Sequence, residues 1–317
     1  MDKEVVVLRN NGSGIFVQTN TISTSMFPRC VVLKDVDGDE DLDLIAASRF
    51  LYDVNVSLNL GNGIFSPPDV YTLATGPQSF GCWADIVDVD GDQIPDLVVT
   101  NEETLYAFSN IGNGDFDGPT TFPIQNYSSA TFFESGDLDG DGDTDLVIAK
   151  TSTNGLLNPQ VMLNDGNGSF AGGVLPGQDS QFFQISLADF DGDGDLDISG
   201  NRIGFSGFSV DILRNSGNAN FEDWQSLPLG TFAIDSADFN NDGDIDLIAA
   251  FEEVTVGLNP CFLPGDVNLD DAVNLLDVGP FVDLLTAGGY QIEADVNQDR
   301  VLDLLDVGPF VELLLDL

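Results

Sequence analysis

The chain has 317 residues, of which 54 are acidic and only 9 are basic, so its formal charge is −45 and its pI is about 4.1. This charge excludes nucleic acid as a natural partner and disfavours anionic membrane surfaces. The sequence has no histidine, which excludes Ser-His-Asp and Cys-His nucleophile systems and His-based zinc sites. No segment reaches the roughly 18 apolar residues of a membrane span.

The first predicted strand, residues 5–10, runs into a turn with the sequence NNGSGIF. Asn-Gly and Gly-Asn pairs between apolar residues are typical of hairpin turns, because both residues tolerate positive φ. Similar turns lie in 58–65, 108–116, 163–170 and 213–221. The phenylalanines that close the turns are predicted to be core residues: Phe16, Phe65, Phe116, Phe170 and Phe221.

An aspartate-rich loop, first seen as DVDGDEDLDLIAA from Asp35, lies between successive turns. It recurs from Asp88, Asp137, Asp189 and Asp238, at intervals of 53, 49, 52 and 49 residues. Positions 1, 3, 5 and 9 are Asp or Asn in every copy. Position 7 is Ile94 in the second copy, so this position is expected to contribute a backbone carbonyl. Oxygen ligands at alternate positions with glycines between them favour calcium over zinc or copper.

Each period of about 50 residues reads as four short strands, with one strand on either side of the aspartate loop and one on either side of the turn. Four strands in a period of this length predict a mainly β fold, a β-propeller of about five four-stranded blades. Residues 5–10 and 254–259 each resemble the third strand of an incomplete blade. We therefore expect a fragment of a larger propeller, and a closed five-blade ring with one displaced strand is the alternative.

Residues 1–258 resemble the FG-GAP/VCBS repeat family, the calcium-binding propeller repeats also found in integrin α-chain heads. The resemblance implies that each calcium loop joins the first and second strands of its blade, near one face of the propeller. It implies five structural Ca2+ ions. The implied ligands are Asp35, Asp37, Asp39, Asp43, Asp88, Asp90, Asp92, Asp96, Asp137, Asp139, Asp141, Asp145, Asp189, Asp191, Asp193, Asp197, Asp238, Asn240, Asp242 and Asp246.

Residues 259–264 are a predicted linker, because NPCFLPGD carries the prolines and glycine typical of one. The segment that follows, 265–317, contains its own duplication. DVNLDDAVNLLDVGPFVDLL begins at Asp266 and DVNQDRVLDLLDVGPFVELL begins at Asp295, 29 residues later. Each copy has Asp or Asn at positions 1, 3, 5 and 9 and Asp at position 12, and an apolar segment long enough for a short helix follows.

This tail resembles the type I dockerin, a module of two calcium-loop and helix units that docks to a cohesin domain. The resemblance implies a cohesin-like partner and two further Ca2+ ions. The ligands would be Asp266, Asn268, Asp270, Asn274, Asp277, Asp295, Asn297, Asp299, Asp303 and Asp306. Arg300 replaces the usual position-6 glycine of the second loop, which is expected to weaken that site. Positions that help choose the cohesin hold Leu275, Leu276, Leu304 and Leu305, which are equally well explained as core, so the identity of the partner stays open.

Weak calcium sites suit extracellular conditions, so we expect secretion or display on the cell surface. The N-terminus lacks a signal peptide, which agrees with an N-terminally truncated fragment. The three cysteines, Cys30, Cys82 and Cys261, form no metal or redox motif. Buried free thiols are expected, and one disulfide remains open.

Three functions are compatible with the sequence. The first is a non-catalytic calcium-binding propeller for protein or glycan binding or adhesion. The second is a carbohydrate-binding accessory module, in which exposed aromatics such as Trp83 or Trp224 would contact the glycan unless they are buried. The third is a fragment of a secreted polysaccharide-degrading enzyme whose catalytic domain lies upstream. Nothing in the sequence pairs any two acids outside the loops, so these are interpreted as surface charge: Glu102, Glu103, Glu134, Asp211, Glu222 and Asp223.

Overall fold

The structure is a computed structural model. It describes residues 3–25, 27–48, 53–73, 83–101, 103–124, 129–151, 159–175, 181–204, 207–227, 233–239, 244–250, 254–257, 278–287, 307 and 309–311. The described residues form 21 strands and the helix of residues 278–287, and residues 307 and 309–311 are also helical. Every strand pairing is antiparallel and joins strands that are consecutive in the sequence.

Four sheets have four strands each, and we number them blades 1 to 4. Blade 1 contains β3 (Pro28–Lys34), β4 (Asp43–Ser48), β5 (Asp53–Ser57) and β6 (Asp69–Thr72). Blade 2 contains β7 (Trp83–Val87), β8 (Asp96–Thr100), β9 (Thr104–Asn110) and β10 (Phe116–Pro123). Blade 3 contains β11 (Ser129–Gly136), β12 (Asp145–Thr151), β13 (Gln160–Asn164) and β14 (Phe170–Val174). Blade 4 contains β15 (Gln181–Ala188), β16 (Asp197–Gly204), β17 (Gly207–Asn215) and β18 (Phe221–Leu227).

The two end sheets are incomplete, as the strand pattern predicts. At one end β1 (Glu4–Asn10) pairs with β2 (Phe16–Ser23), and we call this pair the terminal hairpin. At the other end β19 (Ala233–Ala237), β20 (Asp246–Ala250) and β21 (Val254–Gly257) form the three-stranded blade 5. Of the about five four-stranded blades predicted, the described residues contain four complete ones and blade 5, which has no fourth strand there.

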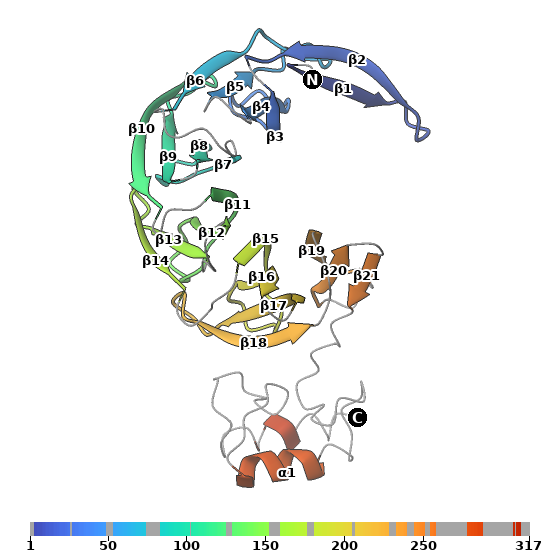
Figure 1. Cartoon of the computed structure of the whole chain (residues 1–317), viewed down its shortest axis with the longest axis vertical. Coiled ribbons are helices and arrows are strands. Elements are labelled where there is room, and N and C mark those ends of the chain that lie inside the picture. Colours follow the sequence, from blue (N-terminus) through green and yellow to red (C-terminus); the bar gives the residue numbers. More distant parts are fainter. Residues whose placement is uncertain are drawn as a thin grey trace.

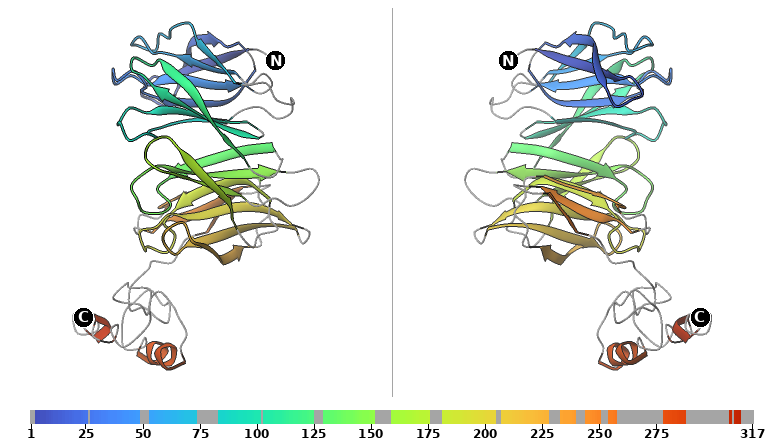
Figure 2. Two further views of the ribbon diagram at one scale, coloured as in Figure 1. Left: turned by 90° about the vertical axis from the view of Figure 1, so that its left-hand side faces the viewer. Right: turned by 90° about the vertical axis from the view of Figure 1, so that its right-hand side faces the viewer.

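The blades follow one another along an open arc (Figures 1 and 2). The first strand of each blade lies on the inside of the arc and the fourth on the outside (Figure 1). Neighbouring inner strands are in contact, as for β3 with β7, β11 with β15 and β15 with β19. The described strands form no closed ring, so the alternative of a closed five-blade ring is wrong for this structure.

The hydrophobic core lies between neighbouring blades. One cluster joins Ile45 of blade 1 to Leu97 of blade 2, and equivalent clusters join blades 2 to 3, 3 to 4 and 4 to 5. All six residues of β4 and all five of β8 are buried, so both faces of these second strands are covered. The strands that leave the aspartate loops are thus the most firmly packed elements of each blade.

The phenylalanines that close the turns have different environments. Phe116 and Phe170 are buried, and Phe65 and Phe221 are half-buried. Phe16 is 61% exposed, so the prediction of a core position is wrong there. The described residues place no blade beyond the terminal hairpin, and nothing covers this side chain.

Helix α1 (Val278–Ala287) belongs to the first copy of the tail repeat. Its Phe281 stacks on Phe310 of the second copy, with ring centroids 4.1 Å apart and an interplanar angle of 5°. The two residues occupy the same position in the two copies, 29 residues apart. Val278 and Val307, also equivalent, pack against this pair. Within the described residues, no helix is both long and apolar enough to cross a membrane.

Candidate metal centres

The aspartate loops connect the first and second strands of each blade, where the family resemblance places them. We number them loop 1 to loop 5, beginning at Asp35, Asp88, Asp137, Asp189 and Asp238. Because the same connection recurs in each blade, the loops lie at the same end of their blades. Loop 5 is only partly described, since residues 240–243 lie outside the described residues.

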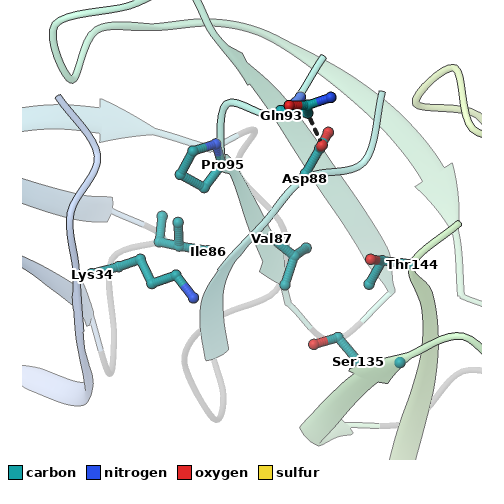
Figure 3. A pocket seen from close by; sticks show the side chains of 9 residues that line it. Lys34, Ile86, Val87, Asp88, Gln93, Pro95, Ser135 and Thr144 are labelled. Carbon is teal, nitrogen blue, oxygen red and sulfur yellow. Dashed lines mark hydrogen bonds between the residues drawn. The ribbon is translucent and has the colours of Figure 1, made fainter. Parts of the chain in front are cut away.

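Backbone N–H groups of the loop itself hold the carboxylates in place. In loop 2, Asp88 accepts hydrogen bonds from the backbone N–H groups of Gly91 and Gln93, both at 2.8 Å. Figure 3 shows the bond to Gln93. Asp90 accepts from the N–H of Asp92 at 3.3 Å. The same bonds recur in loops 1, 3 and 4. Each loop is therefore folded around its own aspartates at positions 1 and 3.

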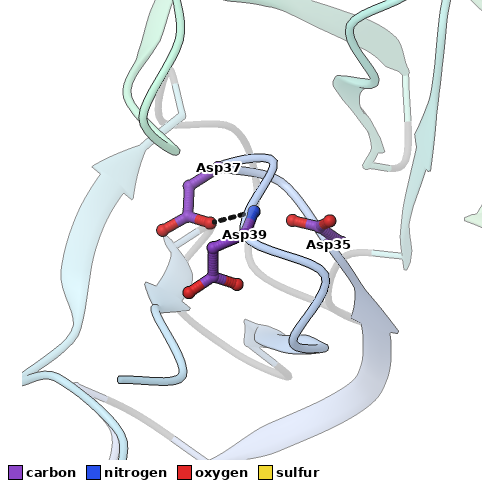
Figure 4. A group of neighbouring side chains, drawn as sticks. All are labelled: Asp35, Asp37 and Asp39. Atoms are coloured by element: carbon purple, nitrogen blue, oxygen red, sulfur yellow. Dashed lines mark hydrogen bonds between the residues drawn. The ribbon is translucent and has the colours of Figure 1, made fainter. Parts of the chain in front are cut away.

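Four loops bring three carboxylates together, with one oxygen of each within 4.8 Å of the others (Figure 4 for loop 1). The clusters are Asp35, Asp37 and Asp39; Asp88, Asp90 and Asp96; Asp137, Asp139 and Asp145; and Asp189, Asp191 and Asp197. Predicted positions 1 and 3 thus meet in all four loops, and position 9 joins them in three. The remaining predicted ligands of these loops, Asp43, Asp92, Asp141 and Asp193, lie outside these clusters.

The other predicted ligands are incompletely described. In loop 5, Asp238 and Asp246 flank the gap, and Asn240 and Asp242 lie outside the described residues. All ten predicted ligands of the tail lie outside them too, within 258–277 and 288–306, as do Leu275, Leu276, Leu304 and Leu305. These assignments stay predictions.

The position-9 aspartate joins the loop to the Asn-Gly turn of the same blade. In blade 4, Asp197 is fully buried and accepts from the N–H of Phe190 at 2.9 Å and from the N–H of Asn215 at 2.7 Å. Asp43, Asp96 and Asp145 accept the equivalent pairs of bonds in blades 1 to 3. A carboxylate oxygen has more than one lone pair, so these bonds leave acceptor capacity for a cation.

The asparagine at the start of each turn has a structural function that was not predicted from the sequence, which is to bond one blade to another. The Nδ2 groups of Asn110, Asn164 and Asn215 each donate to a position-2 carbonyl in the loop of the preceding blade. For Asn215 the acceptor is the carbonyl of Leu138, at 2.8 Å. The same Nδ2 group also donates to the carbonyl of Leu196 in its own loop, at 3.2 Å. The available signal was the asparagine itself, which stands at this position in all five turns, including Asn10.

Burial raises the pKa of several of these carboxyl groups. Desolvation is the main cause, and neighbouring carboxylates add to it, whereas backbone N–H donors oppose it. The pKa rises to about 6 for Asp145, about 7 for Asp191 and about 8 for Asp197. Repulsion and desolvation make it unfavourable to keep these clustered carboxylates ionised, and a bound divalent cation offsets this free-energy penalty.

Loop 4 contains a buried carboxylate oxygen with no hydrogen-bond partner. The Asp191 side chain is 1% exposed, and its Oδ2 accepts no hydrogen bond. The Nη1 atom of Arg214 lies 3.8 Å away, outside hydrogen-bonding distance. Oδ2 belongs to a residue of the loop 4 cluster, and a donor set made only of hard oxygens fits calcium.

Two acids outside the loops are not surface charges, contrary to the prediction. Asp211 is buried and accepts hydrogen bonds from Arg202 at 3.0 Å, Ser209 at 2.9 Å and Ser226 at 2.6 Å. Glu134 is half-buried on β11, and burial, together with the carboxylates of Asp85 and Asp235, raises its pKa to about 7.

The remaining predicted features can be placed in part. Trp83 is half-buried and packs against Phe132, with ring centroids 4.7 Å apart, so packing explains it. The side chain of Trp224 lies outside the described residues. Cys30 is a buried free thiol, as expected, and Cys82 and Cys261 lie outside the described residues.

Comparison with known families supports the repeat assignment. The FG-GAP-like repeat matches three overlapping segments, residues 35–99, 88–148 and 137–198, which together cover just over half of the chain. Each segment begins at position 1 of one aspartate loop and ends in the strand after the next loop. No curated protein matches the chain significantly.

Two solved structures are among those similar to the chain. A lectin from Agrocybe aegerita that recognises non-reducing terminal N-acetylglucosamine is 21% identical, with a TM-score of 0.57 over 81% of this chain and 72% of the lectin. The biofilm matrix protein Bap1 of V. cholerae is 14% identical, with a TM-score of 0.45 over 75% of this chain and 42% of Bap1. The likeness to the lectin concerns the fold alone at this level of identity.

Proposed function

Because the chain belongs to the FG-GAP-like repeat family, we propose that it is a non-catalytic, calcium-binding propeller that binds a protein or glycan ligand outside the cell. The C-terminal tail would tether this propeller to a cohesin-type partner. The alternative function is that of a carbohydrate-binding accessory module, or of a fragment of a secreted polysaccharide-degrading enzyme.

Calcium binding is supported chiefly by the oxygen clusters of loops 1 to 4. In loop 4 the buried Oδ2 of Asp191 accepts no hydrogen bond, and the Arg214 guanidinium lies 3.8 Å away, beyond hydrogen-bonding distance, so the oxygen can still ligate a cation. Asp189, Asp191 and Asp197 would hold the ion in this loop, and the equivalent predicted ligands would do so in the others. The ion would supply positive charge among carboxylates that otherwise repel one another.

The proposed role of calcium is structural. The carbonyl at position 2 of loop 3, that of Leu138, accepts hydrogen bonds from Asn215 Nδ2 at 2.8 Å and from the N–H of Ala219 at 3.0 Å, both in blade 4. An ion that fixes the conformation of loop 3 therefore also fixes the acceptor for the next blade. Loops 1 and 2 offer their position-2 carbonyls to the following blade in the same way.

The tether proposal rests on the duplicated tail. Stacking of Phe281 on Phe310 brings together equivalent residues of the two copies, an arrangement suited to two similar calcium-loop and helix units. We expect the full chain to bind a type I cohesin in calcium and to lose binding after chelation, measured by calorimetry. Absence of binding to several type I cohesins in calcium would count against the tether.

Thermal unfolding in calcium and in chelator tests the proposed structural role. Each filled site adds about 3 kcal/mol when free calcium exceeds Kd about a hundredfold, so chelation should lower Tm markedly. Asp191→Asn should reduce this difference, because it weakens loop 4. Asp195→Asn, at position 7 of the same loop, serves as the matched control, since its side chain is not a predicted ligand. An equal Tm in calcium and in chelator would refute the proposal.

A further inference from the structure

A pocket of about 470 Å³ lies beside loop 2, where the inner strands β3, β7 and β11 end (Figure 3). Its lining includes Lys34 from β3, Val87 from β7, Gln93 and Pro95 from loop 2, Ser135 from β11 and Thr144 from loop 3. The volume is within the range of about 300–1,000 Å³ typical of small-ligand sites. Three blades thus contribute to one concave surface on the side of the propeller that carries the calcium loops.

The polar groups of the pocket suit a ligand with several hydroxyl groups. Lys34 offers an ammonium donor, Gln93 an amide and Thr144 a hydroxyl that donates or accepts. The Ser135 hydroxyl donates to Asp85 Oδ2 at 3.4 Å and keeps lone pairs that accept. Lys34 is exposed, and no carboxylate in the described part of the chain forms an ion pair with it. Its ammonium is therefore available to a ligand.

The charges around the pocket favour a neutral ligand. Asp88 lines the pocket, and the Asp85 carboxylate lies near enough for Lys34 to lower its pKa, whereas burial has the larger, opposite effect. Asp85 opposes a phosphate or another polyanion, Lys34 opposes a cation, and the charge of Asp88 would be offset by the proposed calcium. Val87 and Pro95 add an apolar surface, which matches the C–H face of a sugar ring. A saccharide residue has hydroxyl groups at its edge and an apolar C–H face, so it matches the polar and apolar groups of this pocket.

Gln93, which lines the pocket, has a strained backbone. Its φ is 69°, a left-handed conformation that costs a residue with a side chain about 1 kcal/mol. Loops 3 and 4 have glycine at the same position, Gly142 and Gly194, where the conformation carries no such cost. Glu40 of loop 1 shares the strain, with φ 70°, but does not line the pocket. Strain of this kind is a reason to look for function at the residue.

We propose that this pocket binds one residue of a neutral glycan, with Lys34, Gln93, Ser135 and Thr144 hydrogen-bonding its hydroxyl groups and with Val87 and Pro95 against its apolar face. The inference deepens the proposed function and rests on it, because Gln93 belongs to a calcium loop. Asp88 Oδ2 accepts the N–H of Gln93 at 2.8 Å, so the predicted position-1 ligand also orients the residue at the pocket. Glycan binding should therefore weaken when calcium is removed.

The experiment uses the full chain and soluble neutral probes: cello-, xylo-, manno- and chito-oligosaccharides, titrated by calorimetry in calcium. At least one series should bind. Gln93→Gly and Lys34→Ala should each weaken that binding about tenfold or more, the loss expected for one hydrogen bond of about 1.4 kcal/mol. Glu40→Gly is the matched control, because it removes the same backbone strain in loop 1 and leaves the pocket unchanged.

The two glycine variants separate binding from folding. Both should keep the Tm of the parent chain or raise it, since glycine relieves a left-handed residue. If calcium binds and no neutral oligosaccharide does, or if Gln93→Gly and Lys34→Ala bind the probe as well as Glu40→Gly does, the pocket assignment is wrong and the calcium proposal stands. If the parent chain binds no calcium, the proposed function itself fails.

Discussion

Single asparagines connect the blades. Asn110, Asn164 and Asn215 each have a backbone N–H bonded to the position-9 aspartate of their own blade and a side chain bonded to the loop of the preceding blade. One residue thus couples a calcium loop, a hairpin turn and a neighbouring blade. Its acceptor lies 74 to 77 residues away in the sequence, so no local pattern could reveal this bond.

Asn215→Ala should lower the free energy of unfolding by about 1–3 kcal/mol, because it removes a buried donor to two carbonyls. The matched control is Asn10→Ala in the terminal hairpin, where the equivalent residue is exposed and its Oδ1 accepts from the N–H groups of Gly12 and Gly14 in the same turn, so its effect should be smaller. Urea unfolding of both variants in calcium makes the comparison. Equal losses in the two variants would mean that the bond between blades contributes nothing measurable.

The free energy of unfolding should depend on pH because of Glu134. Its pKa rises from 4.5 to about 7 on folding, chiefly through burial and then through Asp85 and Asp235. The folded state therefore keeps a proton that the unfolded state has lost between these two values, so stability is complete below pH 4.5 and falls as pH rises to 7.

Glu134→Gln should remove this loss. The variant should match the parent chain near pH 4 and exceed its free energy of unfolding by about 1–3 kcal/mol at pH 8. Urea unfolding across this pH range in calcium measures the difference, with Glu4→Gln on the exposed edge of β1 as the control for the loss of one charge. A difference that stays constant with pH would contradict the assigned burial of Glu134.

Among the elements, the second strands and the aspartate loops were predictable, because the residues that determine each of them are close together in the sequence. Alternating aspartates followed by runs such as DLIAA indicate a loop and then a fully buried strand wherever they occur. The burial of the turn phenylalanines was not predictable in the same way. Phe16 and Phe170 follow similar turns, yet in the part of the chain that the structure describes only Phe170 is buried against a neighbouring element, and that difference depends on position along the arc.

Phe170→Ala should therefore lower the free energy of unfolding by about 3 kcal/mol, as for a buried phenylalanine that loses its contacts. Phe170 is 8% exposed and its ring meets that of Phe122 edge to face. Phe16→Ala should change stability by about 0.5 kcal/mol or less, because the side chain is exposed. Guanidinium unfolding compares the two, and a large loss for Phe16→Ala would mean that another element covers the terminal hairpin in solution.

For the whole molecule, counting strands predicted the mainly β architecture and the incomplete blades at both ends of the arc. The openness of the arc was not predictable, because it depends on whether the sheets at the two ends of the arc pack against each other. Three of the four described clusters contain a position-9 aspartate, whereas loop 1 uses position 5, a difference of local loop geometry that the shared spacing does not encode. The charge of −45 is explained largely by residues assigned to these loops and to the tail.

Calorimetric titration of the chelator-treated full chain with calcium tests the central claim most directly. The account predicts about seven bound ions, five in the propeller and two in the tail, each held by an oxygen-only site of the kind that calcium prefers. Magnesium, which is smaller and demands a stricter geometry, should not reproduce this stoichiometry. A chain that binds no calcium, or that takes up magnesium equally well at the same sites, would contradict the assignment of the aspartate loops as structural calcium sites.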